Sequence, residues 1–240
     1  MIKIIADFLG YDISRKKKSS NLSSHLALIL KQLDVNLVLD VGANTGQFGS
    51  LLRGCGYNGD IFSFEPTKES FDLLSLRAKK DSKWSVFNLG LGDKSEINTI
   101  NIFDASDLNS ILSPSELGEK RFKARMKIKK TESIRIETGD SILNEIDLPN
   151  KRIFLKMDTQ GYDLKVFNGC QKSMPYILGL VSEIPLQHIY KQSISYHDIL
   201  KKYEDNNFMI SGIYPVSRNK DNQTIIEVDC VMIKNSTNCS

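Results

Sequence analysis

The stretch that most constrains the fold of this chain runs from Leu37 to Gly49 and reads LVLDVGANTGQFG. It begins with an apolar run of strand type and continues into a turn that contains Gly42 and Gly46. A second apolar run, Ile61 to Phe64, ends in Glu65. Glycine lets a ligand approach the backbone closely, and an acid after the second strand can accept hydrogen bonds from two ribose hydroxyls. The two runs therefore predict a nucleotide-cofactor site at the carboxyl edge of an α/β sheet.

The residues of the turn narrow the choice of ligand. A dinucleotide-binding turn needs G-x-G-x-x-G, but Asn44 holds the second glycine position here and Gln47 the third. A phosphate-binding loop needs a lysine after its last glycine, and none follows Gly46. The turn therefore suits a smaller ligand, an adenosine that carries an amino-acid tail. A turn that binds nothing is disfavoured because suitable residues occur together: Asp40, Gly42, Asn44, Gly46 and Glu65.

Length and composition favour one soluble domain. The chain has 240 residues, of which 40% are hydrophobic and 25% charged, as in ordinary globular proteins. Its net charge of +3 is too small to indicate a nucleic-acid partner. No apolar run approaches the ~20 residues that span a bilayer. The cysteines form no C-x-x-C pair and no zinc spacing, which favours a reducing, cytoplasmic compartment: Cys55, Cys170, Cys230 and Cys239.

The two ends of the chain are expected to lie outside the main domain. We assign residues 1–34 to an amino-terminal helical extension, 35–234 to the domain and 235–240 to a disordered tail. The start, MIKIIADFLG, lacks the small-residue cleavage site of a signal peptide, and basic residues follow at 15–18. One hypothesis is an amphipathic helix that contacts an anionic membrane surface. A terminal helix packed on the domain, followed by a solvated loop, is the interpretation we favour.

Apolar strands alternate with amphipathic helices, which predicts a mostly parallel sheet covered by helices on both faces. Strands are expected at 35–41, 61–65, 84–89, 153–157 and 179–184, with a closing antiparallel pair at 208–214 and 225–233. Helices are expected at 22–33, 47–55, 68–79, 140–146, 162–168 and 196–206, and a turn at 90–93. Between 97 and 136, period-two patterning predicts short antiparallel strands in an insertion near the cofactor edge.

Acids recur where the predicted strands end: Asp40, Glu65, Asp158 and Glu183. The carboxyl ends of the strands meet in one crevice of an open α/β sheet. An isolated buried carboxylate is costly, so its repeated presence at strand ends indicates a use. Any one of these acids, Asp158 above all, could instead cap the helix that follows. Several acids in one crevice favour a site.

Several motifs resemble the FkbM family of methyltransferases that use S-adenosylmethionine. These are LVLDVGANTGQFG, FSFEP, the LGLGD segment at 89–93, FLKMDTQGYDLKVFNG at 154–169 and SEIPLQHIY at 182–190. The resemblance covers roughly residues 35–233. It implies a class I methyltransferase fold, with a seven-stranded mostly parallel sheet, one antiparallel strand and an insertion after the third strand. The usual reaction of the family moves a methyl group to a hydroxyl, often of a sugar or a polyketide-like molecule.

Residue roles toward the cofactor S-adenosylmethionine follow from the resemblance and from physical argument. The glycine backbone and the start of the following helix would take the carboxylate of the methionine tail, and Glu65 with Pro66 would take the ribose. Gly90 and Asp93 would border the adenine, with Asp93 accepting from its exocyclic amine. The tail would be held by four residues: Asp40, Gly42, Asn44 and Gly46.

An alcohol is a poor nucleophile, so a base or a metal should assist the transfer. Asp158 is the first candidate base and Glu183 the second. His188 is either a base that titrates near neutral pH or an ordinary loop histidine.

The acceptor is expected to be a small molecule or a glycan, and its pocket is expected to include Gln160, Tyr162 and Tyr190. A magnesium ion needs only one or two protein carboxylates besides water and substrate oxygens. Asp158 and Glu183 together could therefore hold such an ion between the acceptor hydroxyls.

A dense basic stretch lies within the insertion: Lys120, Arg121, Lys123, Arg125, Lys127, Lys129 and Lys130. It could receive an acidic acceptor such as a uronic-acid-containing glycan. Because Met126 and Ile128 alternate with the basic residues, we favour the solvated face of a hairpin.

Three functions are left in competition. The leading hypothesis is an S-adenosylmethionine-dependent O-methyltransferase acting on a sugar hydroxyl. An NAD-dependent oxidoreductase is the alternative that Asn44 and Gln47 oppose. A non-catalytic module on the same fold would be expected to lose Gly42, Glu65 or Asp158, and all three are present.

Overall fold

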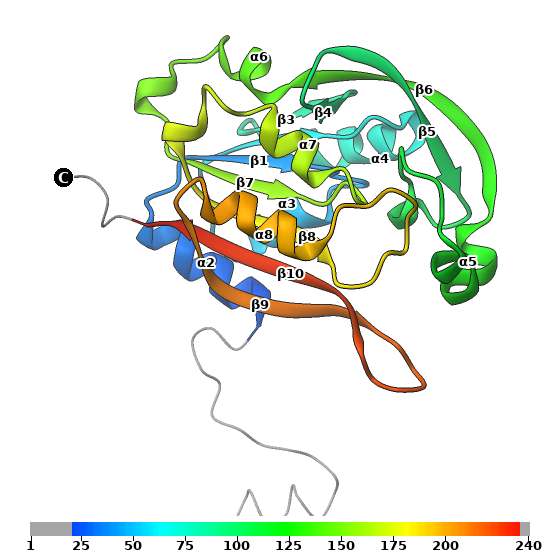
Figure 1. The fold of residues 1–240 in the computed structure, drawn as a ribbon. Coiled ribbons are helices and arrows are strands. Elements are labelled where there is room, and N and C mark those ends of the chain that lie inside the picture. Colours follow the sequence, from blue (N-terminus) through cyan, green and yellow to red (C-terminus); the bar gives the residue numbers. More distant parts are fainter. Residues whose placement is uncertain (1–20, 236–240) are drawn as a thin grey trace, which may run out of the picture.

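The computed structural model describes residues 21–235. The strands of its main sheet are β1 (Leu37–Val41), β2 (Asp60–Phe64), β3 (Trp84–Phe87), β7 (Ile153–Met157), β8 (Ile177–Pro185), β9 (Phe208–Arg218) and β10 (Ile225–Lys234). They form one seven-stranded sheet in the order β3-β2-β1-β7-β8-β10-β9 (Figure 1). β10 runs antiparallel to both of its neighbours, and the other pairs are parallel. The predicted mostly parallel sheet with one antiparallel strand is confirmed.

β1 and β7 lie at the centre of this sheet, and every residue of both strands is buried. Continuous apolar runs are typical of parallel strands that are covered on both faces. Two members of these runs nevertheless carry charge: Asp40 in β1 is the register partner of Lys156 in β7. Ser63 of β2 is the register partner of Asp40 on the other side. Because side chains at the same register position share a face, these three meet on one face of the sheet.

Helices cover both faces of the sheet (Figure 1). One apolar core contains residues of α2 (Leu22–Gln32), α3 (Gln47–Gly54) and α4 (Lys68–Ala78). The other contains residues of α6 (Gly139–Leu143), α7 (Asp163–Asn168) and α8 (Tyr196–Glu204). These helices agree with the predicted ones apart from their ends.

α2 begins directly after an N-cap residue, Asn21, as the sequence predicts. The Asn21 side chain accepts the Ser24 N–H at 2.9 Å, which satisfies one free donor of the first turn. The helix buries Leu26, Ile29 and Leu30 on one face, at the spacing of an amphipathic helix. It therefore packs into the same core as the sheet.

The insertion forms a second, three-stranded sheet in the order β4-β6-β5. Its strands are β4 (Gly90–Gly92), β5 (Glu96–Phe103) and β6 (Ile128–Thr138), and the loop between β5 and β6 holds η1 (Ser106–Leu108) and α5 (Glu116–Phe122). The structure differs from the prediction in two places. Most of the expected turn at 90–93 is a strand, because it pairs in parallel with the end of β6. The antiparallel strands expected to be short between 97 and 136 are long, because β6 pairs with β5 along most of its length.

Residues 1–20 and 236–240 lie outside the described part of the chain. The predicted terminal helix, its basic residues and residues 236–240 of the predicted carboxyl-terminal tail fall on these residues. Within residues 21–235, no helix has the length and apolar character needed to cross a membrane.

Candidate active site

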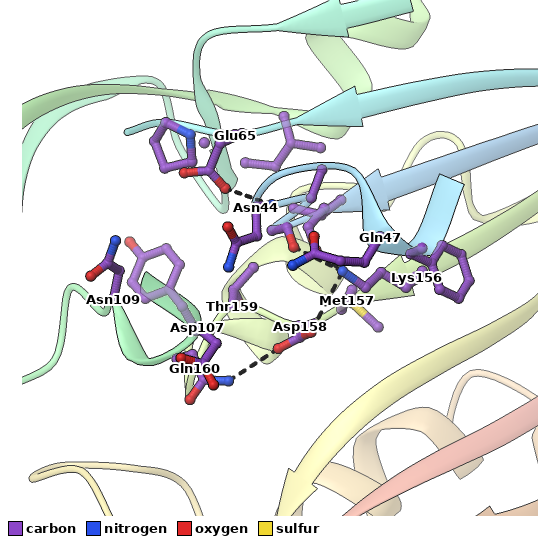
Figure 2. Close-up of a pocket in the computed structure, with 18 of the residues that line it drawn as sticks. Asn44, Gln47, Glu65, Asp107, Asn109, Lys156, Met157, Asp158, Thr159 and Gln160 are labelled. Carbon is purple, nitrogen blue, oxygen red and sulfur yellow. Dashed lines mark hydrogen bonds and ion pairs between the residues drawn. The ribbon is translucent and has the colours of Figure 1, made fainter. Parts of the chain in front are cut away.

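A cavity of about 350 Å³ lies at the carboxyl ends of β1, β2 and β7, beneath the insertion. The turn after β1 contributes Asn44 and Gln47, and the insertion contributes Asp107 and Asn109 (Figure 2). The cavity therefore lies at the edge of the sheet where the acids were predicted to meet.

The turn after β1 lies directly against the end of β7. Gly42 has a φ of +74°, and its N–H donates to the Phe64 carbonyl at 3.1 Å. A Cβ atom at this position would lie 2.0 Å from the backbone oxygen of Asp158. Only glycine allows the two backbones to approach this closely while the turn keeps a left-handed conformation.

Glu65 connects the end of β2 to the glycine turn. Its carboxylate accepts the backbone N–H of Asn44 at 2.9 Å, and it accepts both the backbone N–H of Thr67 at 3.0 Å and the Thr67 hydroxyl at 2.5 Å. The side chain is 7% exposed, and burial raises its pKa against the lowering effect of these hydrogen bonds. Because each carboxylate oxygen can accept more than one hydrogen bond, Glu65 keeps acceptor capacity toward the cavity that it lines.

A buried ion pair lies at the floor of the cavity, with Lys156 in the lining and Asp40 beneath it. Lys156 Nζ lies 3.1 Å from Asp40 Oδ1 and 3.6 Å from Asp158 Oδ2, and it donates to the Gly42 carbonyl at 2.8 Å. Burial lowers the pKa of Lys156, but the charges of Asp40 and Asp158 outweigh it, and the net shift is upward. Lys156 is therefore a fixed cation that connects β1, β7 and the glycine turn.

Beneath the floor, two hydrogen bonds lead from Asp40 toward β3. Ser63 Oγ donates to Asp40 Oδ2 at 2.9 Å, and the indole N–H of Trp84 donates to Ser63 Oγ at 2.9 Å. Asp40 thus has partners on both sides, which is what a fully buried carboxylate requires.

Gln160 forms the centre of a second network. Its Nε2 donates to Asp158 Oδ1 at 3.1 Å and to Glu183 Oε1 at 2.8 Å. Its Oε1 lies 2.9 Å from the Tyr190 hydroxyl, which also has the Leu108 carbonyl at 2.9 Å. Figure 2 shows the Asp158 carboxylate between Lys156 and Gln160. Both oxygens of Asp158 therefore face a positive or hydrogen-donating group of the protein.

Three further carboxylates, those of Glu183, Glu227 and Asp229, interact electrostatically with Asp158. Burial, and then the charge of Asp158, raise the pKa of Glu183 well above its ordinary value. Burial raises the pKa of Glu227, and burial with the Asp158 charge raises that of Asp229 to about 7. Lys156 is the cation that acts on Asp229 in this group. The carboxylates cannot all ionise together near neutral pH, because they repel one another in a poorly solvated site.

The raised pKa of Asp229 predicts a pH-dependent gain in stability for Asp229→Asn. Between the ordinary value of 3.8 and about 7, the folded state holds a proton that the unfolded state has lost. The stability contribution of Asp229 therefore falls as pH rises through this window, and its full cost is present above pH ~7. Thermal unfolding from pH 4 to 8 should show that the variant gains little at pH 4 and most at pH 8. An equal shift in Tm at both ends would contradict the raised pKa.

The structure brings together more than half of the residues predicted for the site. Those that line the cavity are Gly42, Asn44, Glu65, Pro66, Gly90, Asp158, Gln160 and Tyr162. Those outside its lining are Asp40, Gly46, Asp93, Glu183, His188 and Tyr190. Asp40 lies beneath the floor, and Glu183 and Tyr190 contact the cavity through Gln160.

Three predicted residues are not brought to the cavity: Gly46, Asp93 and His188. Gly46 lies against Leu74 and Trp84 instead. Asp93 pairs with Lys165 at 2.7 Å on the side of α7. His188 is exposed, and its Nδ1 lies 2.7 Å from the Ser193 hydroxyl. Neither Asp93 nor His188 lines the cavity. The role of Asp93 at the adenine and that of His188 as a base therefore stay predictions.

The carboxylates do not form a metal site as they are arranged. No group of three or more His, Cys, Asp or Glu side chains in residues 21–235 has the geometry to hold a metal ion. Asp158 and Glu183, the two expected ligands, both accept from the amide of Gln160. An amide donor thus occupies the position between them that a shared cation would need.

Sequence reasoning missed Lys156 and Asp229, two charged residues that lie in strands of the main sheet and line the cavity. Both had a visible signal. Lys156 interrupts the apolar strand IFLKM, and Asp229 lies with Glu227 inside the apolar run IIEVDCVMI. A charge within a buried strand needs a partner or a use, so the pattern could have indicated both. Asp107 and Asn109 had no such signal, because they come from an irregular loop of the insertion.

The basic stretch at 120–130 does not line the cavity. Arg125 pairs with Asp107 at 2.7 Å, Lys129 with Asp104 at 3.2 Å, and Lys130 with Glu132 at 3.8 Å. These contacts agree with the predicted solvated surface, but the predicted hairpin is wrong for most of the stretch. Lys120 and Arg121 lie in α5, and Lys123 and Arg125 lie in the 3-10 helix η2 (Lys123–Met126).

Comparison with known proteins identifies relatives of this chain. The family profile described as the methyltransferase FkbM domain matches residues 40–210. The hexuronic acid methyltransferase AglP of Haloferax volcanii is 24% identical over 162 residues, which cover 66% of this chain. The chain spans 60% of the length of that relative.

Solved structures of other methyltransferases align over most of the chain. An rRNA methylase from Streptococcus thermophilus is 10% identical, with a TM-score of 0.47, and covers 90% of this chain and 98% of its own. Magnesium protoporphyrin IX methyltransferase from Synechocystis PCC 6803 is 9% identical, with a TM-score of 0.45. Its alignment covers 92% of this chain and 87% of its own. The profile match spans the glycine turn, Glu65 and Asp158. The chain belongs to the FkbM family of methyltransferases.

Proposed function

We propose that this protein is an S-adenosylmethionine-dependent O-methyltransferase that acts on a sugar hydroxyl of a glycan or glycoconjugate. The observation that carries the proposal is one cavity with two chemically different walls. One wall has the glycine turn and Glu65, and the other has Asp158 and Gln160. A cofactor and an acceptor can therefore meet within it.

The residues present fit the parts of S-adenosylmethionine. Glu65 lines the cavity, and its Oε2, which accepts the Asn44 N–H, keeps a second acceptor position for a ribose hydroxyl. The backbone of the glycine turn and the start of α3 suit the carboxylate of the amino-acid tail. An apolar part of the wall suits a purine ring: Pro66, Leu91, Ile134, Ile136 and Tyr162.

The bound cofactor would supply an electrophilic methyl group on a sulfonium sulfur. The protein must orient the acceptor oxygen in line with that methyl group and keep water out. Asp158 is held on both of its oxygens, by Lys156 and by Gln160. Its carboxylate is thus a fixed negative charge at the reacting end of the cavity.

A sugar acceptor is supported by the name of one relative, a hexuronic acid methyltransferase. We propose a small acceptor rather than nucleic acid, because the net charge is only +3 and Arg125, Lys129 and Lys130 pair with nearby acids. The fold alone does not fix the acceptor.

The cofactor is tested by calorimetric titration of the purified protein with S-adenosylmethionine, with NAD as the parallel ligand. We expect S-adenosylmethionine to bind and NAD to give no heat. Incubation with the labelled cofactor and methyl glycosides of hexoses and hexuronic acids then tests the transfer. Binding of NAD alone would overturn the proposal in favour of an oxidoreductase.

Glu65→Gln should weaken the binding of S-adenosylmethionine by about tenfold or more, which corresponds to ~1.4 kcal/mol. The amide keeps the shape of the side chain but loses the charge and half of the acceptor capacity that the ribose would use. Glu69→Gln, on the exposed first turn of α4, is the matched control and should bind as the wild type does. An unchanged Kd for Glu65→Gln in the same titration would remove Glu65 from the cofactor site.

A further inference from the structure

We propose that Asp229 is the general base that takes the proton from the acceptor hydroxyl. The inference rests on the proposed O-methyltransferase function and adds a residue to it. Asp229 lies on β10, outside every motif that carries the family resemblance.

Asp229 lies in the wall of the cavity beside Asp158, which we assign to the acceptor side. It lines the cavity together with Asp158 and Lys156. It is the register partner of Glu183 on β8, so the antiparallel strand brings its side chain to the face that carries the site. Leu22 at the start of α2 and Phe48 of α3 line the same cavity, and they supply an apolar wall on this face.

The carboxylate of Asp229 is free, whereas that of Asp158 is not. No described residue donates a hydrogen bond to the Asp229 side chain or pairs with it as an ion. Asp158 has Gln160 on one oxygen and Lys156 near the other. A base must accept a hydrogen bond from the hydroxyl that it deprotonates, and Asp229 has both oxygens available for it.

The other acids are less suited to the role. Glu183 accepts from Gln160 and does not line the cavity. Glu227 accepts from the Ser217 hydroxyl at 2.8 Å and also lies outside the lining. Asp107 lines the cavity but pairs with Arg125.

The surroundings of Asp229 increase its basicity. Burial raises its pKa to about 7, with contributions from the charges of Asp158, Asp163 and Glu227, while Lys156 acts in the opposite direction. Its register partners are Glu183 on β8 and Tyr214 on β9, whose pKa values burial also raises. A carboxylate that titrates near neutral pH is partly ionised in the cell, and it is a stronger base than an ordinary Asp.

The step balances without a further reagent. The acceptor oxygen forms a bond to the methyl carbon while the carbon–sulfur bond breaks and its electron pair stays on sulfur. The hydroxyl proton moves to Asp229, which later releases it to water. The step transfers one methyl group and one proton, and it involves no oxidation or reduction.

The experiment compares Asp229→Asn with wild type and with Asp104→Asn, an exposed control on the insertion. We expect Asp229→Asn to lower kcat for methylation of a hexose or hexuronic acid methyl glycoside by about 100-fold or more. The acceptor KM and the Kd for S-adenosylmethionine should change by less than about threefold. The wild-type kcat should rise with pH through an apparent pKa near 7, and this limb should be absent in the variant. Asp104→Asn should behave as wild type.

A second readout needs no turnover. Carbon NMR of wild-type protein with labelled aspartate should contain a carboxyl resonance that titrates near pH 7 and is missing in Asp229→Asn. A variant that keeps more than about a tenth of the wild-type kcat, or the absence of such a resonance, would overturn the assignment. Failure of the proposed function would look different, because the wild-type protein would then bind no S-adenosylmethionine.

Discussion

Lys156→Met is expected to lower the free energy of unfolding by about 3–5 kcal/mol. The substitution keeps the length of the side chain but removes the cation, and Asp40 remains fully buried with only the Ser63 hydroxyl as a partner. An uncompensated charge in a buried strand is among the most costly changes that a fold can undergo. Chemical denaturation monitored by circular dichroism measures the loss.

The double variant Asp40→Asn/Lys156→Met is the matched control. It removes both charges of the pair, which lie 3.1 Å apart, and should recover a large part of the stability lost in Lys156→Met. The double-mutant cycle isolates the coupling energy between the two side chains. If the double variant were less stable than Lys156→Met, the ion pair would not be the cause of the loss.

Gly42→Ala is expected to abolish measurable binding of S-adenosylmethionine and to destabilise the fold by more than about 2 kcal/mol. The left-handed φ of +74° is strained for alanine, and the new Cβ would lie 2.0 Å from a backbone oxygen of Asp158. The turn has to move away from β7, and it takes with it the N–H of Asn44 that holds Glu65. Thermal unfolding and calorimetric titration report the two effects separately.

Gly54→Ala is the control for this change. Gly54 ends α3, where a Cβ would meet no atom within 4 Å. Alanine favours helix over glycine by up to about 1 kcal/mol, so this variant should be as stable as the wild type or slightly more stable, with an unchanged Kd. Normal cofactor binding by Gly42→Ala would show that the turn can open without loss of the site.

The parts of the site that a sequence predicts well are those that one local segment specifies. The glycine turn and Glu65 follow directly from strands whose apolar runs are unambiguous, and the structure places them in the cavity. Asp158 follows from the same logic at the end of β7. Here residue type, spacing and position on the sheet all agree.

Contacts between distant segments were not predictable in the same way. Lys156 and Asp40 meet only because β7 lies beside β1 in the sheet, and Asp229 reaches the site only because β10 is antiparallel. His188 shares a segment with Tyr190, but its side chain is exposed whereas that of Tyr190 is buried. Asp93 pairs with Lys165 and does not line the cavity. Pairings of this kind depend on strand order and loop geometry, which no local pattern contains.

The hydrogen-bonded floor of the cavity has an optical consequence. Trp84 is the only tryptophan of the chain, and its indole N–H leads through Ser63 to Asp40. Its ring also lies against Gly49 in α3, where an added Cβ would be 2.1 Å from it. Any change in the charge of the ion pair or in the tilt of α3 therefore alters the field and the contacts of one indole. We therefore expect the intrinsic fluorescence of the unlabelled protein to report on the underside of the glycine turn, so that binding of a ligand there can be followed in real time before any acceptor is known.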